Sequence, residues 1–140
     1  MEIKIHATPT VEGGRKFLRI ESPVTIILPT GPDSYRKVDT VALWDTGATN
    51  TCIPMKTALA MGIPLGEPAP VRRMVSTEPS RFCQFYLHFP DGGDLFIPEA
   101  LAVPKMQSRF VIGMDVMRHG KVNIEPDGQD GVDFTFTLNP

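Results

Sequence analysis

Residues 43–49 read Leu43-Trp44-Asp45-Thr46-Gly47-Ala48-Thr49, "LWDTGAT". This stretch puts a carboxylate, a hydroxyl and a glycine in succession at the end of the apolar run "KVDTVALW" (37–44), which its β-branched residues predict to be a strand. Asp-Thr-Gly can be an ordinary turn, in which Asp bonds its own backbone and Gly takes a positive φ. A chance occurrence in a chain of this length has a probability of roughly a few per cent. The elements around the tripeptide therefore have to decide between a turn and a catalytic site.

Those surroundings predict an all-β chain with two short helices. Fourteen prolines and twelve glycines divide the chain into short runs of alternating or β-branched apolar residues. We expect helices at 54–62, where Pro54 suits the first turn and Gly62 the position past the end, and at 114–120, where Gly120 is the stop. We expect strands at residues 2–7, 16–20, 24–28, 37–44, 50–53, 71–76, 81–89, 95–98, 99–103, 109–112, 121–125 and 132–138.

A second motif follows Asp45 by about 65 residues: Phe110-Val111-Ile112-Gly113, ahead of the second expected helix. With both motifs in this order, the chain resembles the retropepsin-like aspartic proteases, the single-domain relatives of pepsin that include retroviral and stand-alone bacterial members. The resemblance covers about residues 20 to 125 and implies a retropepsin-like acid protease fold, closed and barrel-like. A length of 140 residues fits one such domain over 1–140.

The resemblance implies an aspartic endopeptidase that works as a homodimer. Peptide hydrolysis by carboxylates needs two of them sharing one proton, because like charges about 3 Å apart cannot both ionise. This chain has one Asp-Thr-Gly, whereas bilobal members of the family carry two in a longer chain. A two-fold axis would supply the second carboxylate by facing Asp45 with Asp45 of the partner subunit. One copy would act as general base on a water, and the protonated copy as general acid.

The same resemblance assigns the other site residues. Thr46 would reach across the axis to the other subunit's backbone, and Gly47 would let the backbone lie close to the carboxylates and the substrate. Residues expected to contact substrate are Ala48, Thr49, Ile112 and Gly113, together with Val75, Ser76 and Thr77 in a flap hairpin expected over 71–89.

Two departures from the retroviral pattern stand out. Retroviral members usually pair an Asp after the Ala with an Arg after the second-motif Gly, and here these positions hold Thr49 and Met114. The expected flap, "RRMVSTEPSRFCQF" (72–85), contains no Gly, so its tip should be stiffer than a Gly-rich one.

Composition argues against other classes of partner and cofactor. Fourteen Lys and Arg against sixteen Asp and Glu, with no basic stripe, argue against nucleic acid and anionic membranes. Cys52 and Cys83 do not stand at metal-ligand spacing to one another or to a histidine, so we expect no metal and no organic cofactor. The N-terminal "MEIKIHATPT" does not read as a secretory signal, and no stretch is long and apolar enough to span a membrane, so we expect a cytoplasmic protein.

Several interpretations stay open at this point. The chain could be a catalytically inactive retropepsin-fold binding or assembly module, or a protease restricted to one partner or to its own precursor. Trp44 is expected to pack in the core and Cys52 to be a small buried hydrophobe. The alternating Phe134, Phe136 and Leu138 form a half-buried strand that belongs either to the core or to a dimer interface.

Overall fold

The computed structural model describes residues 1–70, 78–90, 92–106 and 109–139. The strand expected at 71–76 lies outside these residues. The helices are α1 (Met55–Met61) and α2 (Met114–Met117). The strands are β1 (Glu2–Ala7), β2 (Thr10–Glu12), β3 (Arg15–Phe17), β4 (Glu21–Gly31), β5 (Ser34–Trp44), β6 (Cys52–Pro54), β7 (Arg81–Phe89), β8 (Gly93–Val103), β9 (Phe110–Ile112), β10 (Gly120–Pro126) and β11 (Val132–Leu138).

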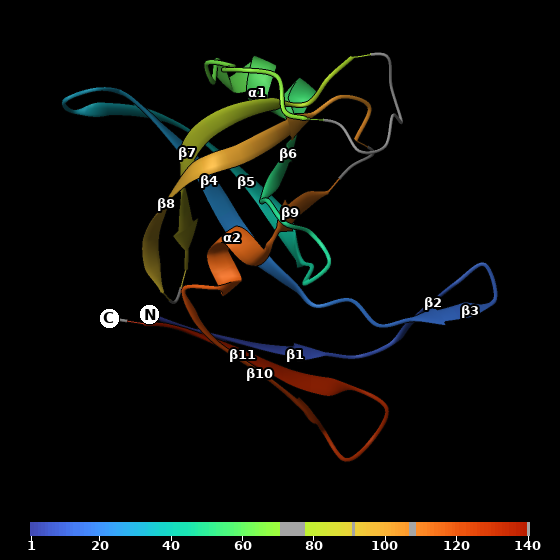
Figure 1. Ribbon diagram of the computed structural model, residues 1–140. Coiled ribbons are helices and arrows are strands. Elements are labelled where there is room, and N and C mark those ends of the chain that lie inside the picture. The colour runs from blue at the N-terminus through green and yellow to red at the C-terminus, as the bar shows by residue number, and fades with distance from the viewer. Residues whose placement is uncertain (71–77, 91, 107–108, 140) are drawn as a thin grey trace.

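Six strands close into a barrel in the order β4-β5-β9-β6-β8-β7, with β7 pairing back onto β4 (Figure 1). The short strand β9 runs parallel to β5 and also touches β6, so that Ile112 is the partner of Trp44 and Val111 is the partner of Cys52. The second sequence motif is therefore threaded beside the strand that ends at Asp45. The expectation of an all-β, closed barrel with two short helices is confirmed.

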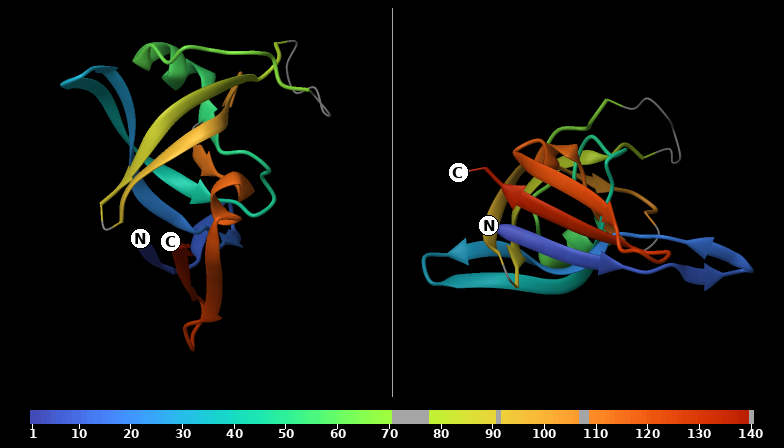
Figure 2. Two further views of the ribbon diagram at one scale, coloured as in Figure 1. Left: turned by 60° about the vertical axis from the view of Figure 1, so that its left-hand side comes forward. Right: turned by 90° about the horizontal axis from the view of Figure 1, so that it is seen from below.

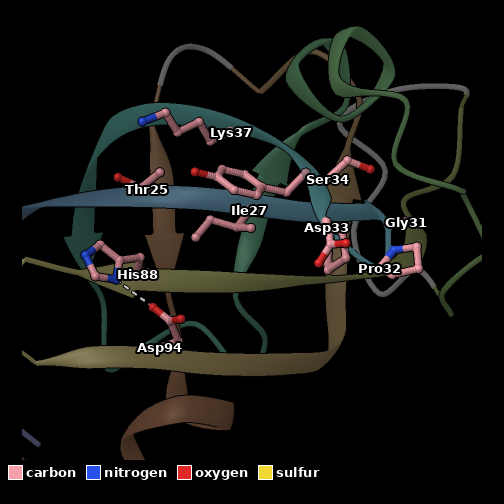
Figure 3. Close-up of a pocket in the computed structure, with 11 residues that line it drawn as sticks. Thr25, Ile27, Gly31, Pro32, Asp33, Ser34, Lys37, His88 and Asp94 are labelled. Atoms are coloured by element: carbon pink, nitrogen blue, oxygen red, sulfur yellow. Dashed lines mark hydrogen bonds and ion pairs between the residues drawn. The ribbon is translucent and has the colours of Figure 1, made fainter.

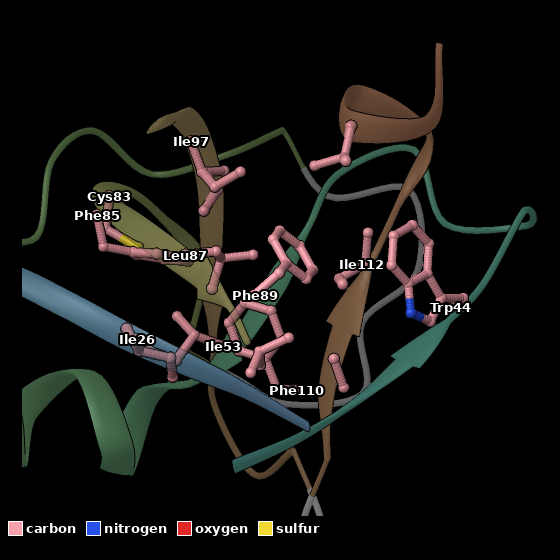
Figure 4. Close-up of a cluster of buried hydrophobic side chains, with 14 of the residues drawn as sticks. Ile26, Trp44, Ile53, Cys83, Phe85, Leu87, Phe89, Ile97, Phe110 and Ile112 are labelled. Carbon is pink, nitrogen blue, oxygen red and sulfur yellow. The ribbon is translucent and has the colours of Figure 1, made fainter. Parts of the chain in front are cut away.

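The barrel closes around a core supplied by alternate residues of each strand. In β7, for example, Cys83, Phe85, Leu87 and Phe89 are buried and the residues between them are more exposed, as a period of two requires. Figure 4 shows these side chains converging with Ile26, Ile53, Ile97, Phe110 and Ile112. Each large apolar side chain removed from water in this way contributes about 1.5–3 kcal/mol to stability.

The two ends of the chain form a separate three-stranded sheet, ordered β1-β11-β10, below the barrel (Figures 1 and 2). Its aromatic residues Phe134 and Phe136 face Trp44, with ring centroids 5.2 and 5.4 Å from that of the indole. Trp44 is buried, and its Nε1 donates to Ser22 Oγ at 2.9 Å. The two phenylalanines thus belong to the core, and Trp44 has the packing role expected for it.

Three local expectations needed correction. The predicted break between 95–98 and 99–103 is absent, because β8 runs through Pro98 where its pairing with β7 shifts register, and such a bulge accommodates a proline. The second helix ends at Met117, well before Gly120. Gly120 instead begins β10, where a Cβ would lie only 2.3 Å from the Thr137 carbonyl oxygen. By contrast α1 ends as expected, with Gly62 at φ 75°.

The hairpin formed by β2 and β3 was only partly foreseen. The sequence predicted one strand at 16–20, whereas the structure has two three-residue strands that pair with each other. Figure 1 and the right-hand view of Figure 2 show this hairpin projecting well beyond the rest of the chain. Because it has no buried face, it lacks the apolar alternation by which a strand is recognised.

Candidate active site

The Asp45 turn follows directly from the end of β5. The backbone N–H of Asp45 donates to the Ile112 carbonyl at 3.0 Å, and the N–H of Ala48 donates to the Asp45 carbonyl at 3.1 Å. The Asp45 carboxylate accepts the N–H of Gly47 at Oδ1, 2.8 Å away. Asp45 is half-buried while Thr46, Gly47 and Thr49 are exposed. The turn therefore holds an oriented carboxylate at the surface.

Gly47 is needed at this turn for space. Its φ lies outside the left-handed region, so the ordinary-turn explanation of a glycine at positive φ does not apply. A Cβ at this position would lie 3.2 Å from Asp45 Oδ1. Glycine keeps the carboxylate uncrowded, which agrees with the close approach expected for it.

Gly113 packs behind the loop that follows the turn. A Cβ there would lie 2.7 Å from the carbonyl carbon and oxygen of Asn50 and 2.8 Å from the Ala48 carbonyl oxygen. Backbone atoms cannot move aside as a flexible side chain can, so only glycine fits. The close packing behind the turn therefore depends on the absence of a side chain at Gly113.

Backbone hydrogen bonds stand where retroviral members carry an ion pair. The N–H of Met114 donates to the Ala48 carbonyl at 2.8 Å, and the N–H of Asp115 donates to the Thr49 carbonyl at 3.1 Å. The start of α2 is thereby attached to the loop without charged side chains at positions 49 and 114.

A polar pair that the sequence analysis missed completes this attachment. Thr51 is fully buried, and its Oγ1 donates to Asp115 Oδ1 at 2.8 Å and accepts the N–H of Gly113 at 3.3 Å. Asp115 Oδ1 also accepts the N–H of Val116 at 3.0 Å. The one signal in the sequence was an acidic residue in the first turn of the helix after the second motif.

The structure divides the expected substrate-contacting residues into three groups. Ala48 is half-buried and Thr49 is exposed, both on the loop itself. Ile112 and Gly113 are buried, and the Ile112 side chain lies wholly in the core. The two residues therefore pack behind the turn instead of being exposed beside it. Val75, Ser76 and Thr77 lie outside the described residues.

The described part of the expected flap begins at residue 78 and contacts the segment 66–69. Residues 66–69 run antiparallel to 80–82, through Ala69 N–H to the Ser80 carbonyl at 2.8 Å, Gly66 N–H to the Phe82 carbonyl at 2.7 Å, and a bridge between Pro68 and Arg81. Residues 81–89 form β7, which pairs with β8 and β4 instead of with residues 71–77, and the rest of the hairpin expected over 71–89 lies outside the described residues.

Cys52 is close enough to the site to have its ionisation affected by it. Burial raises the pKa of the Cys52 thiol to about 11, and the carboxylates of Asp115 and Asp45 act in the same direction. The thiol therefore stays protonated near neutral pH, and its S–H donates to the Asn50 carbonyl at 3.3 Å. A thiolate nucleophile is therefore disfavoured at Cys52.

A second polar cluster lies on the outer face of the barrel (Figure 3). His88 Nδ1 and Asp94 Oδ1 are 2.6 Å apart, next to Thr25, in a hollow of about 660 Å³ bounded by the β4–β5 hairpin. The Thr25 hydroxyl donates its proton to Asp39 Oδ1 at 2.7 Å instead of to His88. The cluster therefore does not form a hydroxyl, imidazole and carboxylate relay of the kind that activates a nucleophile.

Metal chemistry finds no support in the described ranges, which hold no group of three or more His, Cys, Asp or Glu arranged to bind an ion. The acidic turn at Asp127 is explained by backbone hydrogen bonds, since its Oδ1 accepts the N–H groups of Gln129 and Gly131 at 2.8 and 3.2 Å. None of the helices in the described part of the chain is long and apolar enough to cross a membrane.

Comparison with known proteins supports the fold and is silent on the chemistry. No family model matches the chain, and no curated protein matches it. Among solved structures, the chain is similar to a retropepsin-like aspartic protease from Rickettsia conorii, with a TM-score of 0.56 and 13% sequence identity, over 97% of this chain and 91% of that one. At this identity the likeness concerns the fold alone. The chain thus has a retropepsin-like all-β fold that carries Asp45 on the turn after β5.

Proposed function

We propose that this protein is an aspartic endopeptidase whose active site is assembled from two copies of the chain. The observation that carries the proposal is the placement of Asp45. Its carboxylate is oriented by the Gly47 N–H on an exposed turn, at the end of a strand threaded beside β9, in a retropepsin-like fold. The fold explains why a β-strand would deliver an ionisable group to a tight glycine-containing turn.

A single copy cannot perform the reaction. One carboxylate can activate water as a base or donate a proton as an acid, but the attack on an amide and the departure of its nitrogen need both. Across a two-fold axis, Asp45 of the partner subunit supplies the second group, and repulsion between the two charges keeps one proton on the pair. The partner is therefore a second copy of this chain, and the substrate is a peptide or protein segment.

Each proton transfer of the reaction can then be assigned to one of the two Asp45 carboxyl groups. The ionised carboxylate takes a proton from the water that attacks the scissile carbonyl, while the protonated carboxylate donates to the developing oxyanion and then to the leaving nitrogen. Because the two groups titrate as a unit, the apparent pKa values belong to the pair. The remaining residues position the turn: Gly47 leaves room for the carboxylate, and Gly113 and Thr51 hold the loop behind it.

The exposed side chains of the loop fit roles at the interface and at the substrate. Thr46 is exposed next to Asp45 and is suited to contact the other subunit, and Thr49 is exposed two residues beyond Gly47. A substrate held between two such loops would meet backbone groups from both copies.

The proposal is tested by cleavage of an unbiased peptide library between acidic and neutral pH, at concentrations where light scattering gives the molecular mass. Asp45→Asn is compared with Asp39→Asn, which makes the same change at an exposed position of β5, the strand that leads to Asp45. Cleavage by the wild type and by Asp39→Asn, but not by Asp45→Asn, is the expected result. A confirmed dimer that cleaves nothing would favour a binding or assembly module, or an enzyme specific for one protein.

A further inference from the structure

The hairpin of β2 and β3 is an unusual feature of the chain because it leaves the body of the molecule. All residues from 10 to 18 are exposed, and Figures 1 and 2 show the hairpin extending past the barrel and the terminal sheet. Its contact with the rest of the chain includes an ion pair between Lys16 and Asp130, 3.8 Å apart. Two paired strands by themselves are marginally stable in water, so a hairpin of this kind needs further contacts to persist.

The hairpin carries apolar side chains that water disfavours. Val11 is 67% exposed, Leu18 is 45% exposed and Phe17 is 38% exposed. In the register of the hairpin Val11 pairs with Lys16 and Phe17 pairs with Thr10, so Val11 and Phe17 lie on opposite faces and both faces expose an apolar side chain. Three large apolar residues exposed within eight positions of one projecting element indicate an interaction surface more strongly than scattered single residues do.

The hairpin is also braced internally. Arg19 donates to both carboxylate oxygens of Glu12, at 2.7 and 3.2 Å, and its guanidinium lies 4.8 Å from the centre of the Phe17 ring. This bidentate pair joins the far strand of the hairpin to the segment that returns to the barrel. A projecting segment with such an internal brace is prepared to receive a partner with little further ordering.

The root of the hairpin adjoins the catalytic turn. The Ile20 carbonyl accepts the N–H of Trp44 at 2.8 Å, and Glu21 is paired with Leu43. Glu21 also forms an ion pair with Arg109, immediately before β9. The hairpin therefore leaves the barrel beside the last residues before Asp45.

We propose that residues 10–18 form an arm that clasps a second copy of this chain, an inference that rests on the proposed function because that function requires a second Asp45. A copy that brings its own Asp45 to this one must approach the end of β5, and so must lie beside the root of the arm. Two-fold symmetry then places the arm of each copy on the other copy. Val11, Phe17 and Leu18 of both arms are thereby removed from water. We infer that the arm binds a second copy of this chain because one copy has an incomplete active site and because the arm begins at the edge of that site.

The test uses the full chain and measures its self-association. Val11→Glu with Leu18→Glu places charges on the arm, and Leu59→Glu is the matched control, since Leu59 is 62% exposed on α1. Sedimentation velocity over a dilution series gives the dimer dissociation constant, and circular dichroism checks the fold. We expect the arm variant to dissociate at least about tenfold more readily than the wild type, and the control to match the wild type. An arm variant with wild-type affinity, or a wild type that is monomeric at every concentration, would overturn the proposal.

Hydrogen exchange gives a second readout that needs no substitution. In the wild type, the amides of residues 10–18 should exchange more slowly above the dimer midpoint than below it. Equal exchange rates of these amides above and below the dimer midpoint would contradict the proposal that the arm contacts the second copy. This holds even if the arm variant dissociates for another reason.

The two proposals, the dimerisation arm and the protease activity, can be tested separately. A wild type that dimerises through the arm but cleaves no peptide of the library would leave the arm in place and favour a binding or assembly module, or an enzyme specific for one protein, over a general endopeptidase. A dimer that cleaves peptides and is indifferent to the arm substitutions would overturn the arm alone.

Discussion

The hydroxyl of Thr51 donates to the carboxylate of Asp115 over 2.8 Å, joining residues 64 positions apart in the chain. Thr51 ends the loop that begins at Asp45, and Asp115 lies in the first turn of α2, so this bond joins the two sequence motifs behind the candidate site. Because Thr51 is fully buried and also accepts the N–H of Gly113, the bond is shielded from water. It acts in concert with the backbone hydrogen bonds from Met114 and Asp115 to the loop.

Replacing Thr51 by Val should destabilise the protein with little change in volume. The substitution removes a donor from Asp115 and an acceptor from the Gly113 N–H, and buried groups left without partners cost about 1–3 kcal/mol. Urea unfolding followed by Trp44 fluorescence measures the loss. Thr137→Val, at an exposed position of β11, is the control and should change stability by no more than about 0.5 kcal/mol. Equal effects of the two substitutions would show that the buried pair adds nothing.

The two glycines of the site should respond differently to alanine. Gly113→Ala forces a Cβ against the backbone of Asn50 and Ala48 and should cost about 1–3 kcal/mol, or more if the loop cannot shift. Gly47→Ala meets the Asp45 carboxylate at 3.2 Å, so it should lower activity more than stability. Thermal unfolding and cleavage rates measured side by side separate the two effects. A Gly113→Ala protein as stable as the wild type would contradict the close packing.

The stability contributed by His6 should depend on pH. A hydrogen bond to Asp133, with the nearby charges of Asp133 and Asp127, raises the pKa of His6 above its usual 6.5. A raised folded-state pKa means that this stabilisation is complete below about pH 6.5 and disappears as the pH rises through the folded value. The melting temperature of His6→Gln should therefore fall below that of the wild type at about pH 5.5 and approach it at about pH 8.5. His119→Gln is the control, and a His6→Gln deficit that is constant across this range would refute the explanation.

Cys52 should react slowly with alkylating agents in the folded protein. Its pKa of about 11 leaves only a small fraction as thiolate at pH 8. We expect Cys52→Ser to retain cleavage activity, and iodoacetamide to modify the folded wild type far more slowly than the unfolded chain, as mass spectrometry of timed samples would show. Loss of activity on gentle alkylation would indicate a thiol in the chemistry.

The sequence predicted those elements whose formation depends on residues close together in the chain. Pro54 and Gly62 bracket a helix because one suits its start and the other its left-handed end, and the alternation of Phe134 and Phe136 marks a strand with one buried face. The resemblance carried by the two motifs implied the closed, barrel-like fold in which β9 runs beside β5. The sequence did not decide whether Phe134 and Phe136 belong to the core or to a dimer interface. Only the three-dimensional arrangement shows that they contact Trp44.

What was missed depends on contacts between distant segments. Pro98 reads as a strand break unless the register shift opposite it is known, and Gly120 reads as a helix stop unless Thr137 is known to lie against it. The Thr51 and Asp115 pair could not be read from spacing, since neither residue lies in a motif and their meeting depends on how the barrel closes. The projecting hairpin was hidden because a strand without a buried face has no periodic signal.

Mixing wild-type and mutant subunits shows whether one active site uses Asp45 from both copies. Wild-type chain and Asp45→Asn chain are unfolded together, refolded in equal amounts at constant total concentration, and assayed for peptide cleavage. If each active site needs Asp45 from both copies, random pairing leaves about a quarter of the dimers active, so the rate should fall to about a quarter of that of the wild type alone. A rate of about one half would show that each chain works with its own carboxylate, and would contradict the shared site.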